Sequence, residues 1–229
     1  MRNAIIKTIM CGAITILAWA CSVNHAAKAA ETDDFYHIEG NVIIDTEGNR
    51  YSCFFRTGQG EMDLEEALEM LNQTQVQEIP KVNTGYGNIC QPLYLVGPDE
   101  EVTLTSIETH SLGDAKRITP EMIGPGTLSK TVSTTVSSSL TTSVSVGITA
   151  KLAIFAEVEA ECGVAIQNGT ASTDTFAMSF PVSSGKIAAI YFRPYYVVAT
   201  GNVGRAIFSA AYPQTINGYA DGIFYLVER

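Results

Sequence analysis

The stretch "SKTVSTTVSSSLTTSVSVGITAKLAIFAEVEAECGVAIQ", residues 129–167, keeps its apolar side chains on one parity. With three exceptions, every even position from 132 to 166 is Val, Leu, Ile, Ala or Cys, while the odd positions are mostly Ser, Thr, Lys, Glu or Gly. Such alternation is typical of an amphipathic β-strand, because successive strand side chains point to opposite faces. The stretch therefore predicts long β-strands with a Ser/Thr-rich polar face.

The length of this pattern limits how the chain folds. A straight strand from residue 132 to residue 166 would extend on the order of 115 Å, at about 3.3 Å per residue. A chain of this size that folds compactly has a radius of gyration of roughly 16 to 17 Å. The stretch therefore either turns back on itself or belongs to an elongated protein.

Residues 1–30 have the form of a secretory signal peptide. The basic residues Arg2 and Lys7 precede an apolar run, and small residues surround a cleavage site near Ala29 or Ala30. We therefore expect the protein to be secreted to the extracellular space.

A bacterial lipoprotein signal is the alternative interpretation, with Cys21 as the lipid-bearing residue. Trp19 is bulky where such signals have a small residue, which favours the ordinary signal peptide. No later stretch has 18 uninterrupted apolar residues, so the sequence predicts no transmembrane helix after the signal.

The chain is acidic, with a formal net charge of −10. An acidic surface repels the phosphate backbone of nucleic acids and anionic lipid. We therefore expect no nucleic-acid partner, and a membrane contact must depend on apolar burial or on a receptor.

Three cysteines follow the signal peptide, and export permits a disulfide between two of them. Cys162 has the parity of the apolar face, which predicts a small buried side chain. This leaves Cys53 and Cys90 as the predicted disulfide pair.

The remaining sequence predicts a mainly β, elongated antiparallel protein with long amphipathic Ser/Thr-rich strands and one short helix in its N-terminal part. Residues 31–127 form a mixed part, with a hairpin around "TEGN" at residues 46–49 and a helix in "MDLEEALEMLNQ" that Asp63 caps. Residues 128–229 show no helix signal and are predicted to be all β, with a Pro/Gly-marked connection before them.

Catalytic patterns are not found. Only His37 and His110 follow the signal peptide, and no nucleophile elbow, zinc-protease motif, paired CxxC or phosphate-binding glycine loop is present. We therefore expect neither an enzyme nor a cofactor or metal site.

The alternating segment can form a hairpin with its tip at Lys151–Phe155. The legs, Leu140–Ala150 and Ala156–Ile166, have 11 residues each, and pairing Ala150 with Ala156 places both apolar faces on the same side. A tilted strand needs about 9–11 residues to cross a bilayer. Each leg has the length of such a strand.

The Ser/Thr-rich segment "TVSTTVSSSLTTSVSVGITAKLAIFAEVEAECGVA", followed by "DTFAMSFPVSSGK" and an aromatic strand, resembles the aerolysin-like β-pore-forming proteins, particularly the epsilon-toxin and mosquitocidal-toxin branch. The likeness covers residues 128–200. It implies a secreted pore-forming toxin that forms a homo-oligomer on a target membrane with an unknown receptor. Each protomer then contributes one refolded hairpin to a shared barrel.

In such a barrel the even residues meet lipid, together with the tip aromatic, and the odd residues line the lumen. The predicted lipid face consists of Leu140, Val144, Val146, Ile148, Leu152, Ile154, Phe155, Val158, Val164 and Ile166. The predicted lumen face includes Ser143, Ser145, Thr149, Glu157, Glu159 and Glu161. Rings of carboxylate favour cations, so the sequence predicts a cation-selective pore.

The alternative function is a secreted, non-lytic β-sandwich that serves as a binding, adhesive or structural module. Half-buried strands explain the alternation. They do not explain its unbroken length, nor the near absence of charge on the polar face from Thr131 to Thr149.

Overall fold

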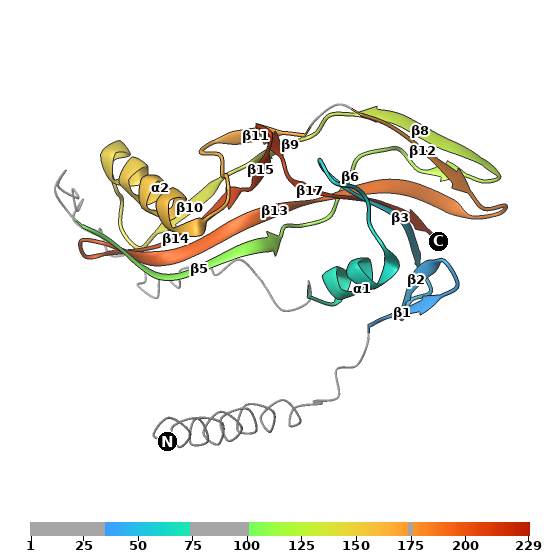
Figure 1. Ribbon diagram of the computed structural model, residues 1–229, viewed down its shortest axis with the longest axis horizontal. Coiled ribbons are helices and arrows are strands. Elements are labelled where there is room, and N and C mark those ends of the chain that lie inside the picture. The colour runs from blue at the N-terminus through green and yellow to red at the C-terminus, as the bar shows by residue number, and fades with distance from the viewer. Residues whose placement is uncertain (1–34, 74–100, 174–175) are drawn as a thin grey trace, which may run out of the picture. The chain divides into compact units, whose positions relative to one another are not determined.

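The computed structural model describes residues 35–73, 101–173 and 176–229. These residues form a mainly β structure with large antiparallel sheets and two helices (Figure 1). The predicted mainly β, antiparallel fold is confirmed. The predicted signal peptide, Cys21 and Cys90 lie outside the described residues.

The helices are α1 (Leu64–Gln73) and α2 (Ile148–Cys162). The strands are β1 (Tyr36–Glu39), β2 (Val42–Asp45), β3 (Arg50–Arg56), β4 (Gly60–Glu61), β5 (Val102–Leu112), β6 (Lys116–Arg117), β7 (Met122–Ile123), β8 (Gly126–Val132), β9 (Thr135–Ser137), β10 (Ser139–Thr142), β11 (Thr170–Ser172), β12 (Phe176–Val182), β13 (Ile187–Val203), β14 (Ala206–Pro213), β15 (Thr215–Ile216), β16 (Tyr219–Ala220) and β17 (Gly222–Glu228).

The predicted hairpin around residues 46–49 is confirmed, since β2 and β3 pair as antiparallel strands. Asp45 holds the turn together. Its carboxylate accepts the backbone N–H groups of Glu47 and Asn49, each at 2.9 Å. It also accepts the side-chain amide of Asn49 at 2.8 Å and the hydroxyl of Tyr51 at 2.9 Å.

These hydrogen bonds give stability a pH dependence. Partial burial raises the pKa of Asp45, but the hydrogen bonds to its ionised carboxylate outweigh burial, and the net pKa lies below its ordinary value of 3.8. The stabilisation is therefore present above the ordinary pKa and is lost as pH falls through the folded-state value. We expect Asp45→Asn to lower the free energy of unfolding in urea at about pH 7 and much less at about pH 2. An equal loss at both pH values would contradict this assignment.

Helix α1 begins where the sequence predicts it. The carboxylate of Asp63 accepts the backbone N–H of Glu66 at 2.8 Å, which is the hydrogen bond of an N-cap residue. Ala67, Met70 and Leu71 form the buried face of the helix, which packs on the sheet.

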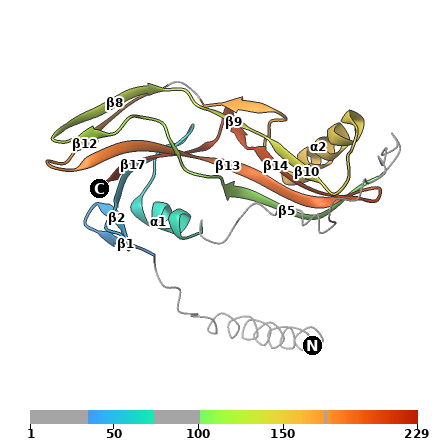
Figure 2. The ribbon, with the colours of Figure 1, turned by 180° about the vertical axis from the view of Figure 1, so that it is seen from behind.

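Strand β13 is the centre of the sheet (Figures 1 and 2). Its first half pairs with β17, β6 and β7, and its second half pairs with β14 and β5. Strands from both sides of the predicted boundary at residue 128 therefore share one sheet. The residues that the structure describes between Phe35 and Arg229 belong to one compact unit.

The two faces of the sheet are covered by different elements because alternate strand residues point to opposite sides. Ile190, Phe192 and Phe224 are fully buried in a cluster with Leu128 of β8 and Phe180 of β12. The opposite face carries a second cluster, in which Tyr195, Ile223 and Tyr225 pack with α1. The β8–β12 pair and α1 accordingly lie on opposite sides of the sheet (Figures 1 and 2).

Candidate functional site

The largest departure from the sequence prediction lies in the predicted hairpin. Residues 148–162, expected to form parts of two strands, are helix α2. The prediction that residues 128–229 are all β is therefore wrong for this stretch. The predicted legs, Leu140–Ala150 and Ala156–Ile166, do not pair with each other in this structure, and β10 pairs with β14 instead.

The composition and spacing of this stretch explain the helix. "ITAKLAIFAEVEAEC" contains four Ala and three Glu residues, which are strong helix formers. In addition, alternate members of the even-numbered series are four residues apart, and residues four apart lie on the same face of a helix. The buried row of α2 is Ala150, Ile154, Val158 and Cys162. A sequence that alternates apolar and polar residues therefore also contains apolar residues at the four-residue spacing of a helix face.

The helix buries only half of its even-numbered residues. The other even residues fall on the opposite face, where the side chain of Ile148 is 78% exposed and that of Leu152 is 53% exposed. Ala156 and Ala160 are exposed as well. A strand would instead place all even residues on one face.

The charges of α2 also oppose a stable helix. Its first turn contains no acidic residue, and its last turn contains no basic residue. Glu157, Glu159 and Glu161 lie toward the C-terminal end, where the helix dipole disfavours negative charge. The helix ends at Gly163, whose left-handed φ of 68° is the usual C-terminal cap.

The other predicted lipid-face residues belong to the same hydrophobic cluster as the buried row of α2. Leu140, Val144, Val146, Phe155 and Val164 are half-buried, and Ile166 is buried. The ring of Phe155 meets the ring of Tyr212 on β14 edge-on, with centroids 5.1 Å apart. The cluster also includes Val197 and Phe208, so α2 packs on the sheet at the second half of β13.

The predicted lumen residues are mostly in contact with solvent. Ser145, Thr149, Glu159 and Glu161 are exposed, whereas Ser143 and Glu157 are half-buried. The Ser143 hydroxyl accepts the backbone N–H of Ile207 at 3.0 Å, which extends the pairing of β10 with β14. None of the three glutamates forms an ion pair within residues 35–73, 101–173 and 176–229.

A two-stranded ladder leads to this segment from both sides. β8 pairs with β12, and β9 pairs with β11, all antiparallel. Beyond β9, the backbone N–H of Ser138 donates to the carbonyl of Gly169 at 2.7 Å, and there the pairing stops. Hydroxyl pairs line the polar face, including Ser129 with Ser179 at 3.0 Å. We call the strands β8 and β9 with Ser138, and their partners β12 and β11 with Gly169, the stem.

The register of the stem changes along its length. In the β8–β12 pair, Leu128 lies opposite Phe180, so even residues face even residues. In the β9–β11 pair, which lies next to the predicted hairpin, Val136 lies opposite Ala171, so even residues face odd residues. A hairpin whose even residues face each other therefore needs a one-residue bulge beyond Ser138.

The cysteines agree in part with the sequence prediction. Cys162 is buried, as its parity predicts, and its thiol donates to the carbonyl of Val164 at 3.1 Å. Cys53 and Cys162 are free thiols, and no disulfide links residues that the structure describes. Cys90 lies outside those residues, so its pairing with Cys53 stays a prediction.

Among the described residues, no helix has the length and hydropathy needed to cross a membrane. No family model, curated protein or solved structure matches the chain.

Proposed function

We propose that this chain is a secreted, aerolysin-like pore-forming protein that assembles on a target membrane and inserts residues 140–166 as a β-hairpin. The observation that carries this proposal is the mismatch between α2 and its own sequence. The helix exposes Ile148 and Leu152, whereas a strand gathers every even residue on one apolar face. The segment has a pattern that its soluble structure does not use.

A bilayer supplies an apolar environment for the apolar face of such a strand, which water does not. Full burial of a Leu or Ile side chain contributes about 1.5–3 kcal/mol. The residues that α2 now buries stay apolar-facing in the hairpin as well, because they have the same even parity. Insertion therefore gains the burial of Ile148 and Leu152 and keeps the burial of Ile154 and Val158.

The stem supports the proposal because it gives the new strands an antiparallel ladder from which pairing can extend. Antiparallel pairing extends most readily from an existing ladder, since the loop-closure entropy has already been lost there. The stem ends at the hydrogen bond between Ser138 and Gly169. Beyond it, the two chain segments no longer pair with each other. Extension from this point requires α2 to leave the sheet and its residues to pair with each other.

Lipid also requires oligomerisation. The two outer edges of a single inserted hairpin have unpaired N–H and C=O groups, which are costly in hydrocarbon. A closed barrel of hairpins from several protomers pairs all of them. The odd residues then line a polar lumen, where Glu157, Glu159 and Glu161 provide acidic rings that favour cations.

The test uses the purified protein without its predicted signal peptide. We expect detergent-resistant oligomers and dye release when it is incubated with permissive cells or with liposomes made from their lipids. A protein that stays monomeric and releases no dye across several membrane types would contradict the proposal. That result would favour the alternative, a non-lytic secreted binding or adhesive module.

A further inference from the structure

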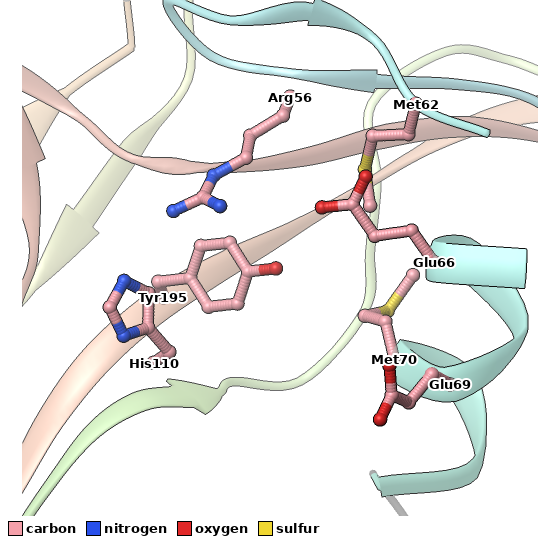
Figure 3. A pocket seen from close by; sticks show the side chains of 7 residues that line it. All are labelled: Arg56, Met62, Glu66, Glu69, Met70, His110 and Tyr195. Carbon is pink, nitrogen blue, oxygen red and sulfur yellow. The ribbon is translucent and has the colours of Figure 1, made fainter.

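A small cavity lies between α1 and the sheet (Figure 3). None of its lining residues belongs to the stem or to α2. Its volume is about 160 Å³. Four separate parts of the chain contribute side chains to it: β3, α1 with the residues before it, β5 and β13. The lining includes Arg56, Met62, Glu66, Met70, His110 and Tyr195.

Arg56 brings a largely buried positive charge to the cavity. Its guanidinium forms an ion pair with Asp221 at 3.0 Å, and the two side chains are 15% and 8% exposed. The Nε of Arg56 and the second carboxylate oxygen of Asp221 are buried without a hydrogen-bond partner among the described residues. Since buried polar groups are normally paired, this charge is not placed for stability alone.

Tyr195 contributes a hydroxyl that stays protonated. The guanidinium of Arg56 lies 4.8 Å from the centre of the Tyr195 ring. The ring of His110 meets Tyr195 edge-on at 5.6 Å. Burial raises the pKa of Tyr195 to about 12, so its hydroxyl is uncharged at neutral pH, and its oxygen can accept a hydrogen bond while its proton is donated. In Figure 3 this hydroxyl points toward α1.

His110 is turned toward this site by an irregularity in β5. Its backbone has a φ of 60°, which is rare for a residue other than glycine. Its N–H donates to the side-chain carbonyl of Gln214 at 3.0 Å, close to the point where the pairing of β5 with β13 shifts register. Such bulges re-aim side chains.

Glu66 faces Arg56 across the cavity (Figure 3). The charge of Glu66 acts on Arg56, yet among the described residues Arg56 has an ion pair only with Asp221. A carboxylate and a guanidinium thus oppose each other with open space between them. Glu69 adds a second carboxylate to the lining.

We propose that this cavity binds a small zwitterion that carries an ammonium group and an oxyanion. Glu66 and the oxygen of Tyr195 accept hydrogen bonds from the ammonium group, while the N–H groups of Arg56 that Asp221 does not use donate to the oxyanion. Met62 and Met70 contact the carbon atoms between the two charges. The site goes beyond the proposed membrane insertion and does not depend on it.

The test titrates the protein with O-phosphoethanolamine, and separately with ethanolamine and inorganic phosphate, which carry only one of the two charges. Calorimetry should show that the zwitterion binds at least about tenfold more tightly than either, because each charge adds a charge-assisted hydrogen bond. In a protein with ¹³C-methyl methionine, the NMR signals of Met62 and Met70 should shift. The signal of Met178, buried in the cluster with Phe180, should not.

A matched pair of variants on α1 tests the assigned residue. Glu65 and Glu66 are both exposed in the first turn, and only Glu66 lines the cavity. We expect Glu66→Gln to weaken binding of O-phosphoethanolamine at least about tenfold and Glu65→Gln to leave it unchanged. Absence of methionine shifts, or equal affinity in both variants, overturns the site.

Vesicles identify the source of the zwitterion. Retention on phosphatidylethanolamine vesicles, together with loss of retention in Glu66→Gln, indicates a lipid headgroup. Binding of the free probe without retention on vesicles indicates a soluble ligand. Dye release is not measured in any of these experiments, so failure of pore formation and failure of this site are distinguished.

Discussion

Replacement of Ala160 by lysine is expected to suppress membrane leakage at least about tenfold while the soluble protein stays folded. Ala160 is exposed on α2, and a lysine near the C-terminal end of a helix is favourable to the helix dipole. In the proposed inserted hairpin, however, Ala160 would lie near the middle of a leg on the lipid face. A lysine at that depth costs about 2–4 kcal/mol in a membrane barrel, and every protomer carries it.

Glu161→Lys is the matched control. Residue 161 is also exposed near the end of α2, so both variants add a lysine to the same part of the soluble structure. Its odd parity places it in the lumen, where charge is tolerated. We expect Glu161→Lys to release dye and to reduce the preference for cations in planar bilayers. Equal leakage from both variants, with unchanged thermal unfolding, would contradict the parity assignment of the hairpin.

Removal of Asp221 is expected to lower the free energy of unfolding by about 3–5 kcal/mol, because it leaves Arg56 as an uncompensated buried charge. The carboxylate of Asp221 is 8% exposed and lies 3.0 Å from the guanidinium. The carboxylate therefore compensates the charge of Arg56, whose side chain is only 15% exposed to solvent. Urea unfolding of Asp221→Ala measures the loss.

Two further variants separate the effect of charge from that of packing. Arg56→Met combined with Asp221→Ala should lose less stability than Asp221→Ala alone, because no buried charge remains unpaired. Glu121→Ala removes two ion pairs of a carboxylate that is 39% exposed, and it should cost at most about 1 kcal/mol. A similar loss in Asp221→Ala and Glu121→Ala would show that burial does not govern the Arg56 pair.

Local signals in the sequence were sufficient for much of the fold. The "TEGN" turn and the Asp63 cap predicted the β2–β3 hairpin and α1 because each depends on hydrogen bonds between residues close in the chain. Parity correctly predicted that Cys162 is buried, although Cys162 lies in a helix and not in a strand.

Helix α2 could not be predicted from parity because alternation contains an i,i+4 row. The choice between helix and strand depends on what packs against it, here Val197, Phe208 and Tyr212, which lie far away in the sequence. The cavity was missed for a related reason. Arg56, His110 and Tyr195 belong to different strands and form no motif, and Glu66 resembles any solvated acidic residue of an amphipathic helix.

The packing along β13 also predicts which amide protons exchange with solvent first. Its first half holds the Phe192–Phe224 cluster, whereas α2 packs only around the second half. Loss of α2 uncovers that second half and leaves the hydrogen bonds of β13 to its neighbouring strands intact. Amide protons of α2 can thus exchange with solvent through a local opening of low free energy. Those of β13 exchange only when the sheet itself comes apart.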